Sequence, residues 1–178
     1  MPKHLGNLTV TAENALSFPA ITEFYGHLTI AAGATLIAPS LTWVRGWLTL
    51  HGRLDAPLLG KVDGWLTLHP DSALNAVNLT EVTRDVMLDG GSIDTRLGSV
   101  GSLTVKRDTS DLSWLVKVNT FLTVGALAHV SMPVLERVNG SITVKPLGAL
   151  HTPELSHIGG YADIDEGATL VAPRFINA

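Results

Sequence analysis

The chain has 178 residues, 46% of them hydrophobic and 16% charged, and it contains no cysteine. This composition excludes an intrinsically disordered chain, a membrane-spanning helix, disulfides and catalysis by a cysteine thiolate. The formal net charge is −4, whereas a domain that follows nucleic-acid phosphates is usually basic, so we expect no direct nucleic-acid binding. The N-terminal segment MPKHLGNLTV has one lysine and no continuous apolar stretch. We therefore expect no signal peptide, no membrane association and a cytoplasmic location.

Apolar residues recur about every twenty residues along the whole chain. One such column contains Leu8, Leu28, Leu48, Leu66, Val86, Leu103, Leu122, Ile142 and Ala162. A repeat of this length is too short to bury its own apolar face, so successive repeats must stack on one another. The sequence therefore predicts a single repeat domain over residues 1–178, a solenoid with about nine coils.

The repeats contain a strand signal that begins near residues 6, 26, 46, 64, 101 and 140, where the chain reads GNLTV, GHLTI, GWLTL, GWLTL, GSLTV and GSITV. Apolar and polar residues alternate in these segments, which is typical of a strand with one buried face. The glycine before the strand suits a tight corner or a close approach between coils. Glycine or proline in nearly every repeat argues against helices. We predict an all-β fold, a right-handed parallel β-solenoid.

The full repeat, P-x-L-x-x-V-x-G-x-L-T-V, is clearest from Pro39 to Leu50. It resembles the repeats of receptor L-domains and of related fungal cell-surface and bacterial leucine-rich-type proteins, and the resemblance covers essentially the whole chain. It implies a right-handed β-helix that serves as a non-enzymatic scaffold, whose outer faces bind ligands or proteins. The resemblance transfers no individual functional residue to this chain.

The outward positions of the G-x-L-T-V strands carry the candidate binding residues. Trp47 and Trp65 occupy one outward column on adjacent coils, and a pair of histidines occupies another. The candidate binding residues are Trp47, Trp65, His51, His69, His27, Asp85 and Asp89. Exposed aromatic rings beside hydrogen-bonding groups suit a protein hot spot or a sugar ring that stacks on indole. An aromatic ladder that only stabilises the sheet explains the same residues equally well.

Metal binding and catalysis find little support in the residues. His51, His69 and Asp89 lie on adjacent coils, but a straight ladder points its side chains in parallel rather than at one centre, so we expect no metal and no cofactor. Carboxylate pairs such as Asp163 and Asp165 would lie on an exposed wall, where nothing desolvates them to separate their pKa values. The chain also lacks a phosphate loop and a Ser-His-Asp signature. We therefore expect no enzymatic activity.

The fifth coil, residues 83–96, departs from the repeat. It lacks the glycine, the threonine and the proline together, and the spacing to the next coil shortens to 17 residues. Such a departure marks either a bend, a functional site or simple sequence drift.

These patterns favour a non-catalytic binding scaffold that presents one flat wall to a protein partner. Two alternatives remain open: a carbohydrate-binding module that uses Trp47 and Trp65, and a phage or mobile-element inhibitor that occludes a nucleic-acid-handling complex. Open strand edges at the ends of a solenoid template further pairing, so we also expect a homo-oligomer through the solenoid ends.

Overall fold

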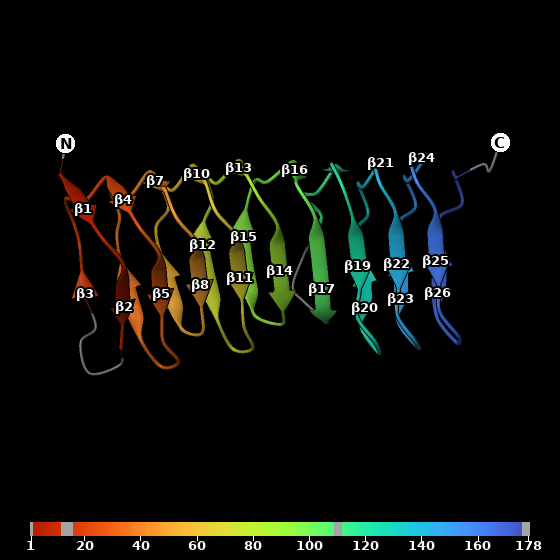
Figure 1. Ribbon diagram of the computed structural model, residues 1–178, viewed down its shortest axis with the longest axis horizontal. Helices are drawn as coiled ribbons and strands as arrows, with labels where there is room; N and C mark the ends of the chain where they lie inside the picture. Colours follow the sequence, from red (N-terminus) through yellow and green to blue (C-terminus); the bar gives the residue numbers. More distant parts are fainter. Residues whose placement is uncertain (1, 12–15, 109–111, 176–178) are drawn as a thin grey trace.

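The computed structural model describes residues 2–11, 16–108 and 112–175. Every regular element in these ranges is a β-strand, and the strands pair in parallel. They stack along one axis into a β-solenoid of about eight turns, with the two ends of the chain at opposite ends of the stack (Figure 1). The all-β parallel solenoid is therefore confirmed, whereas the nine-coil count and the right-handed winding stay predictions. No helix in the described ranges could cross a membrane.

One sheet contains nine strands and runs through the whole stack. In order, its strands are β2 (Leu8–Val10), β5 (Leu28–Ile30), β8 (Leu48–Leu50), β11 (Leu66–Leu68), β14 (Val86–Asp89), β17 (Leu103–Arg107), β19 (Leu122–Val124), β22 (Ile142–Val144) and β25 (Ala162–Ile164). Equivalent residues of successive repeats are direct partners, for example Leu48 with Leu66. The predicted apolar column is thus one continuous ladder.

The valine position of the repeat forms a second set of short strands in two separate sheets. The first consists of β1 (Lys3–Leu5), β4 (Glu23–Tyr25), β7 (Trp43–Val44), β10 (Lys61–Val62) and β13 (Glu81–Val82). The second consists of β16 (Ser99–Val100), β18 (Lys117–Val118), β21 (Arg137–Val138) and β24 (His157–Ile158).

The third set of strands is divided in the same way. One sheet contains β3 (Leu16–Ser17), β6 (Thr35–Ile37), β9 (Arg53–Asp55), β12 (Ala73–Ala76) and β15 (Ser92–Thr95). The other contains β20 (His129–Ser131), β23 (Ala149–His151) and β26 (Thr169–Val171).

The irregular fifth coil is where both shorter sets of strands are interrupted. Among the described residues, only the nine-stranded sheet continues past it, with a register shift between Leu88 and Asp89 opposite β17. The departure predicted at residues 83–96 is therefore a real discontinuity. Residues 109–111, which follow β17 shortly afterwards, lie outside the described residues. In the described ranges, the nine-stranded sheet is the only face that runs unbroken from the first turns to the last.

The inward columns form one continuous apolar core. Leu28, Leu48, Leu66 and Leu122 are fully buried, because each is covered by the equivalent residue of the turns on both sides. Ala162 and Ile164 of β25, the last strand of the nine-stranded sheet, are exposed instead. Within the described residues β25 has a strand neighbour on one side only. Self-association through such edges stays a prediction.

The glycine column is explained by close approach between turns. A Cβ atom on Gly46 would overlap the carbonyl oxygen of Gly26, and one on Gly26 would overlap that of Gly6. Gly6 and Gly26 also have positive φ angles of 103° and 141°, a region that L side chains rarely adopt. These turns therefore stack at a distance that leaves no room for a side chain at Gly26 and Gly46, whereas Arg84 and Thr120 occupy the same column position in two other turns.

We expect Gly46→Ala to lower the free energy of unfolding by about 1–3 kcal/mol, because the added methyl must displace backbone of the adjacent turn. The matched control is Gly98→Ala, where no neighbouring atom lies within 4 Å of the added Cβ and the free energy should change by less than about 1 kcal/mol. Urea denaturation followed by tryptophan fluorescence measures both. Equal effects of the two substitutions would contradict the close-approach explanation.

Candidate functional site

The outward face of the nine-stranded sheet, here called the wall, carries a stack of three aromatic rings. Trp47 and Trp65 directly precede β8 and β11, and their ring centroids lie 4.7 Å apart at an interplanar angle of 17°. The imidazole of His27 stacks on Trp47 from the preceding turn at 4.3 Å. His27 Nδ1 also accepts a hydrogen bond from the backbone N–H of Trp47, at 3.1 Å. Trp47 and Trp65 thus share one column, as the sequence predicted, and His27 lies in the same column.

This stack covers both faces of Trp47 and only one face of Trp65. Each tryptophan remains 43% exposed. For Trp47 this exposure belongs mainly to the ring edge, because rings from the turns before and after it cover its two faces. The next residue in the column is the short Asp85, and beside it the outer face of Trp65 borders a shallow depression. The depression is lined by Trp65, Thr67, Asp85, Val86, Met87 and Thr104.

Asp85 is held in place by the following turn. Its Oδ1 atom accepts a hydrogen bond from the backbone N–H of Ser102, at 3.2 Å. In the same way, Asn7 Oδ1 accepts a hydrogen bond from the backbone N–H of His27, and Ser141 Oγ accepts one from the backbone N–H of Tyr161. Asp85, Asn7 and Ser141 thus each satisfy a backbone donor of the next turn, which fixes the orientation of these side chains.

The two candidate histidines form a second stack on the wall, on the other side of the threonine column. The rings of His51 and His69 lie 3.8 Å apart at an interplanar angle of 12°. Partial burial lowers the pKa of His69, and the nearby charges of His51 and Lys106 lower it further, while Asp89 opposes them. The predicted residues are therefore adjacent, and their stacking favours the neutral form of His69.

Asp89 pairs with a residue that the sequence did not suggest. Its carboxylate accepts from the guanidinium of Arg107 at 3.0 Å, next to the register shift in the sheet. In the described ranges, no group of three histidine and carboxylate side chains is placed to hold a metal ion. Asp89 is thus engaged in a local ion pair rather than turned toward the histidines as a ligand.

The structure contains a cation–π cluster beside the wall that was not predicted from the sequence. The guanidinium of Arg45 lies 3.6 Å from the ring centroid of Trp43 and 4.7 Å from that of Tyr25. Arg45 also forms an ion pair with Glu23, at 3.3 Å. Tyr25 and Arg45 both precede the glycine column at a spacing of twenty residues, and this was the available signal. The charge of Arg45 is thus paired within the chain, whereas the buried indole N–H of Trp43 has no hydrogen-bond partner among the described residues.

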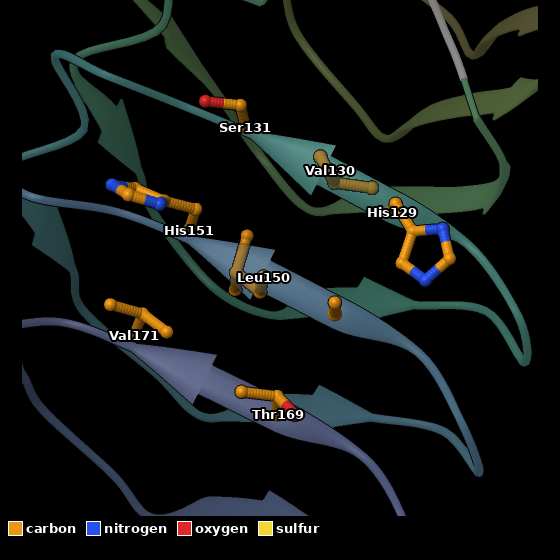
Figure 2. Close-up of a pocket in the computed structure, with 8 residues that line it drawn as sticks. His129, Val130, Ser131, Leu150, His151, Thr169 and Val171 are labelled. Atoms are coloured by element: carbon orange, nitrogen blue, oxygen red, sulfur yellow. The ribbon is translucent and has the colours of Figure 1, made fainter.

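A second depression lies on the three-stranded sheet β20–β23–β26 (Figure 2). His129 and His151 lie at opposite sides of it, and Figure 2 shows their rings pointing away from each other. Between them the surface is formed by small and aliphatic residues such as Ala149 and Thr169. The two histidines of the depression therefore do not form a pair.

Comparisons with known proteins do not assign the chain to a family: no protein-family model, no curated protein and no solved structure matches it. The resemblance to receptor L-domain repeats stays a prediction that rests on the repeat string alone.

The lowered pKa of His69 has a consequence for stability. Its pKa is lower in the folded chain than its ordinary value of 6.5, so at acidic pH the unfolded chain binds the proton more readily. The contribution of neutral His69 to the stability of the folded chain is complete above about pH 6.5. It is lost as the pH falls from there toward the pKa of His69 in the folded chain. We expect His69→Gln to reduce the drop in stability between about pH 7.5 and pH 5.

Urea midpoints at the two pH values measure this effect. The matched control is His129→Gln, an exposed histidine on another sheet, which should keep the drop of the unmodified protein. An undiminished drop in the His69 variant would show that the His51–His69 stack does not resist protonation.

Proposed function

We propose that this protein is a non-catalytic scaffold whose wall binds a protein partner. The observation that carries the proposal is the His27–Trp47–Trp65 stack, which exposes indole edges on the one sheet that runs unbroken through the described turns. Tryptophan is enriched among the residues that dominate binding energy at protein interfaces. The proposal retains the cytoplasmic location expected from the sequence.

Further aromatic residues support this assignment of the wall. Phe121 and Tyr161 occupy the same column as Trp47 and Trp65, and they are 58% and 68% exposed. Exposed aromatic residues along one column give a flat protein surface several anchoring points for a partner.

The parallel ladder also keeps this surface rigid. Backbone hydrogen bonds fix each turn to the next, for example from Leu48 N to the carbonyl of Trp65 at 2.9 Å. Side chains that are already ordered lose little conformational entropy when a partner binds. A rigid wall therefore favours recognition of a preformed surface.

The carbohydrate alternative receives less support. A sugar ring binds tryptophan through the broad face of the indole, and both faces of Trp47 are covered by neighbouring rings. Trp65, which is stacked on one side, lines the depression next to Asp85. A binding site that uses the two indole faces together, as the sequence had suggested, is therefore disfavoured.

The first test separates the wall from the other faces. Thr49→Arg places a long cationic side chain between the tryptophan and histidine columns without removing either stack, so it should abolish partner binding by steric exclusion. Ser131→Arg adds the same side chain to the three-stranded sheet and should leave binding unchanged. Quantitative affinity capture from extracts of the source cells measures both. Equal capture of the same protein by Thr49→Arg and the unmodified chain would overturn the proposal.

The second test removes the stack. A Trp47→Ala/Trp65→Ala variant should lose the captured partner, and it should also lose about 1–3 kcal/mol of stability, because the two rings contact each other. Thermal unfolding gives the stability and shows that the variant is folded at the capture temperature. A folded double variant that captures the same partner at the same level would contradict a binding role for the indoles.

A further inference from the structure

The aromatic stack ends at Trp65, because no ring of the following turn stacks on it among the described residues. The next two positions of the column are Asp85 and Ser102, whose side chains are too short to cover the indole. The outer face of Trp65 therefore forms one side of the depression whose lining also includes Asp85 and Met87. A flat group placed there would continue the stack by one further member.

The depression also contains a carboxylate without a counter-ion. The Ser102 hydrogen bond uses one oxygen of Asp85, and within the described residues no cation pairs with this side chain. Two other carboxylates of the wall are paired, Asp89 with Arg107 and Asp165 with Lys145. Asp85 is therefore oriented and exposed, and its negative charge is available to a ligand beside the indole face.

The chain contains the same combination of groups in a completed form. In the cluster beside the wall, the guanidinium of Arg45 lies 3.6 Å from the ring centroid of Trp43 and pairs with the carboxylate of Glu23. A guanidinium is planar, so it can stack on an indole and donate hydrogen bonds to a carboxylate at the same time. Trp65 and Asp85 provide the indole and the carboxylate, and only the guanidinium is missing.

We propose that the depression between Trp65 and Asp85 binds an arginine side chain of the protein partner. This inference rests on the proposed function and names the chemistry of the partner at one site. A lysine ammonium would satisfy the carboxylate but would not cover the indole as a plane, so arginine is preferred. A neutral sugar would cover the indole but would leave the charge of Asp85 uncompensated.

The test uses small probes and the full chain. In an NMR titration, Nα-acetyl-arginine amide should shift the indole N–H signal of Trp65 saturably, with the millimolar affinity expected of a single side chain, roughly 1–50 mM. The signal is assigned by its loss in a Trp65→Phe variant. Nα-acetyl-citrulline amide has the same shape without the charge and should bind at least about fivefold more weakly. Nα-acetyl-lysine amide should also bind more weakly.

Two variants locate the site. Asp85→Asn keeps an oxygen that can accept from Ser102 N–H but removes the charge, so it should weaken arginine binding at least about fivefold. Asp163→Asn removes an exposed carboxylate from the last turn of the same wall and should leave the affinity at Trp65 unchanged. Methyl glucoside serves as a sugar probe. Three results would each overturn the proposal: no shift of the Trp65 signal with the arginine probe up to about 50 mM, equal affinity for the citrulline probe, or a saturable shift of the Trp65 signal that only methyl glucoside produces.

The outcomes also separate this inference from the proposed function. If Thr49→Arg abolishes partner capture while the arginine probe leaves Trp65 unaffected, the wall binds a protein but the arginine site is wrong. If the arginine probe binds at Trp65 while Thr49→Arg and the double tryptophan variant both capture the same partner normally, the depression recognises a guanidinium, but the wall is not the interface and the assignment to an arginine of that partner is wrong.

Discussion

Parallel backbone hydrogen bonds across the nine-stranded sheet determine which side chains can touch in this protein. Leu28 N donates to the carbonyl of Trp47 and Leu48 N to that of Trp65, each at 2.9 Å. These bonds hold equivalent residues of successive turns at the spacing of paired strands, about 4.8 Å. The 4.7 Å between the Trp47 and Trp65 rings matches this spacing, so flat rings at equivalent positions stack without further adjustment. The same register aligns the buried leucines and closes the glycine corner.

Because each side chain has a neighbour above and below, its chemistry depends on the residue one repeat away. Trp47 lies between two rings and presents its edge, whereas Trp65 is followed by Asp85 and presents a face. The imidazole of His69 lies against His51, which disfavours a second positive charge there. A single substitution in a column therefore changes the environment of two residues, and function on such a wall is set by pairs of neighbours.

The repeat predicted that Trp47 and Trp65 share one column and that His51 and His69 share another, because the strand period and the repeat length together fix which residues are adjacent. It did not predict that the faces of Trp47 would be covered, since that depends on the rotamers of His27 and Trp65 rather than on their positions. The Asp89–Arg107 ion pair could not be predicted from the repeat either. It forms across a register shift, which moves Arg107 by one position relative to the column that the sequence assigns to it.

Two features that the sequence treated separately, the tryptophan pair and the irregular fifth coil, lie side by side in the structure. The depression next to Trp65 is formed where the fifth coil replaces an aromatic residue or serine by Asp85 and the column threonine by Met87. The break in the two shorter sets of strands begins at the same coil, while the wall continues through it. A regular continuation of the repeat with an aromatic residue at position 85 would have closed the stack. The irregular coil thus lacks the ring that would cover Trp65 and places the hydrogen-bonded carboxylate of Asp85 beside it instead.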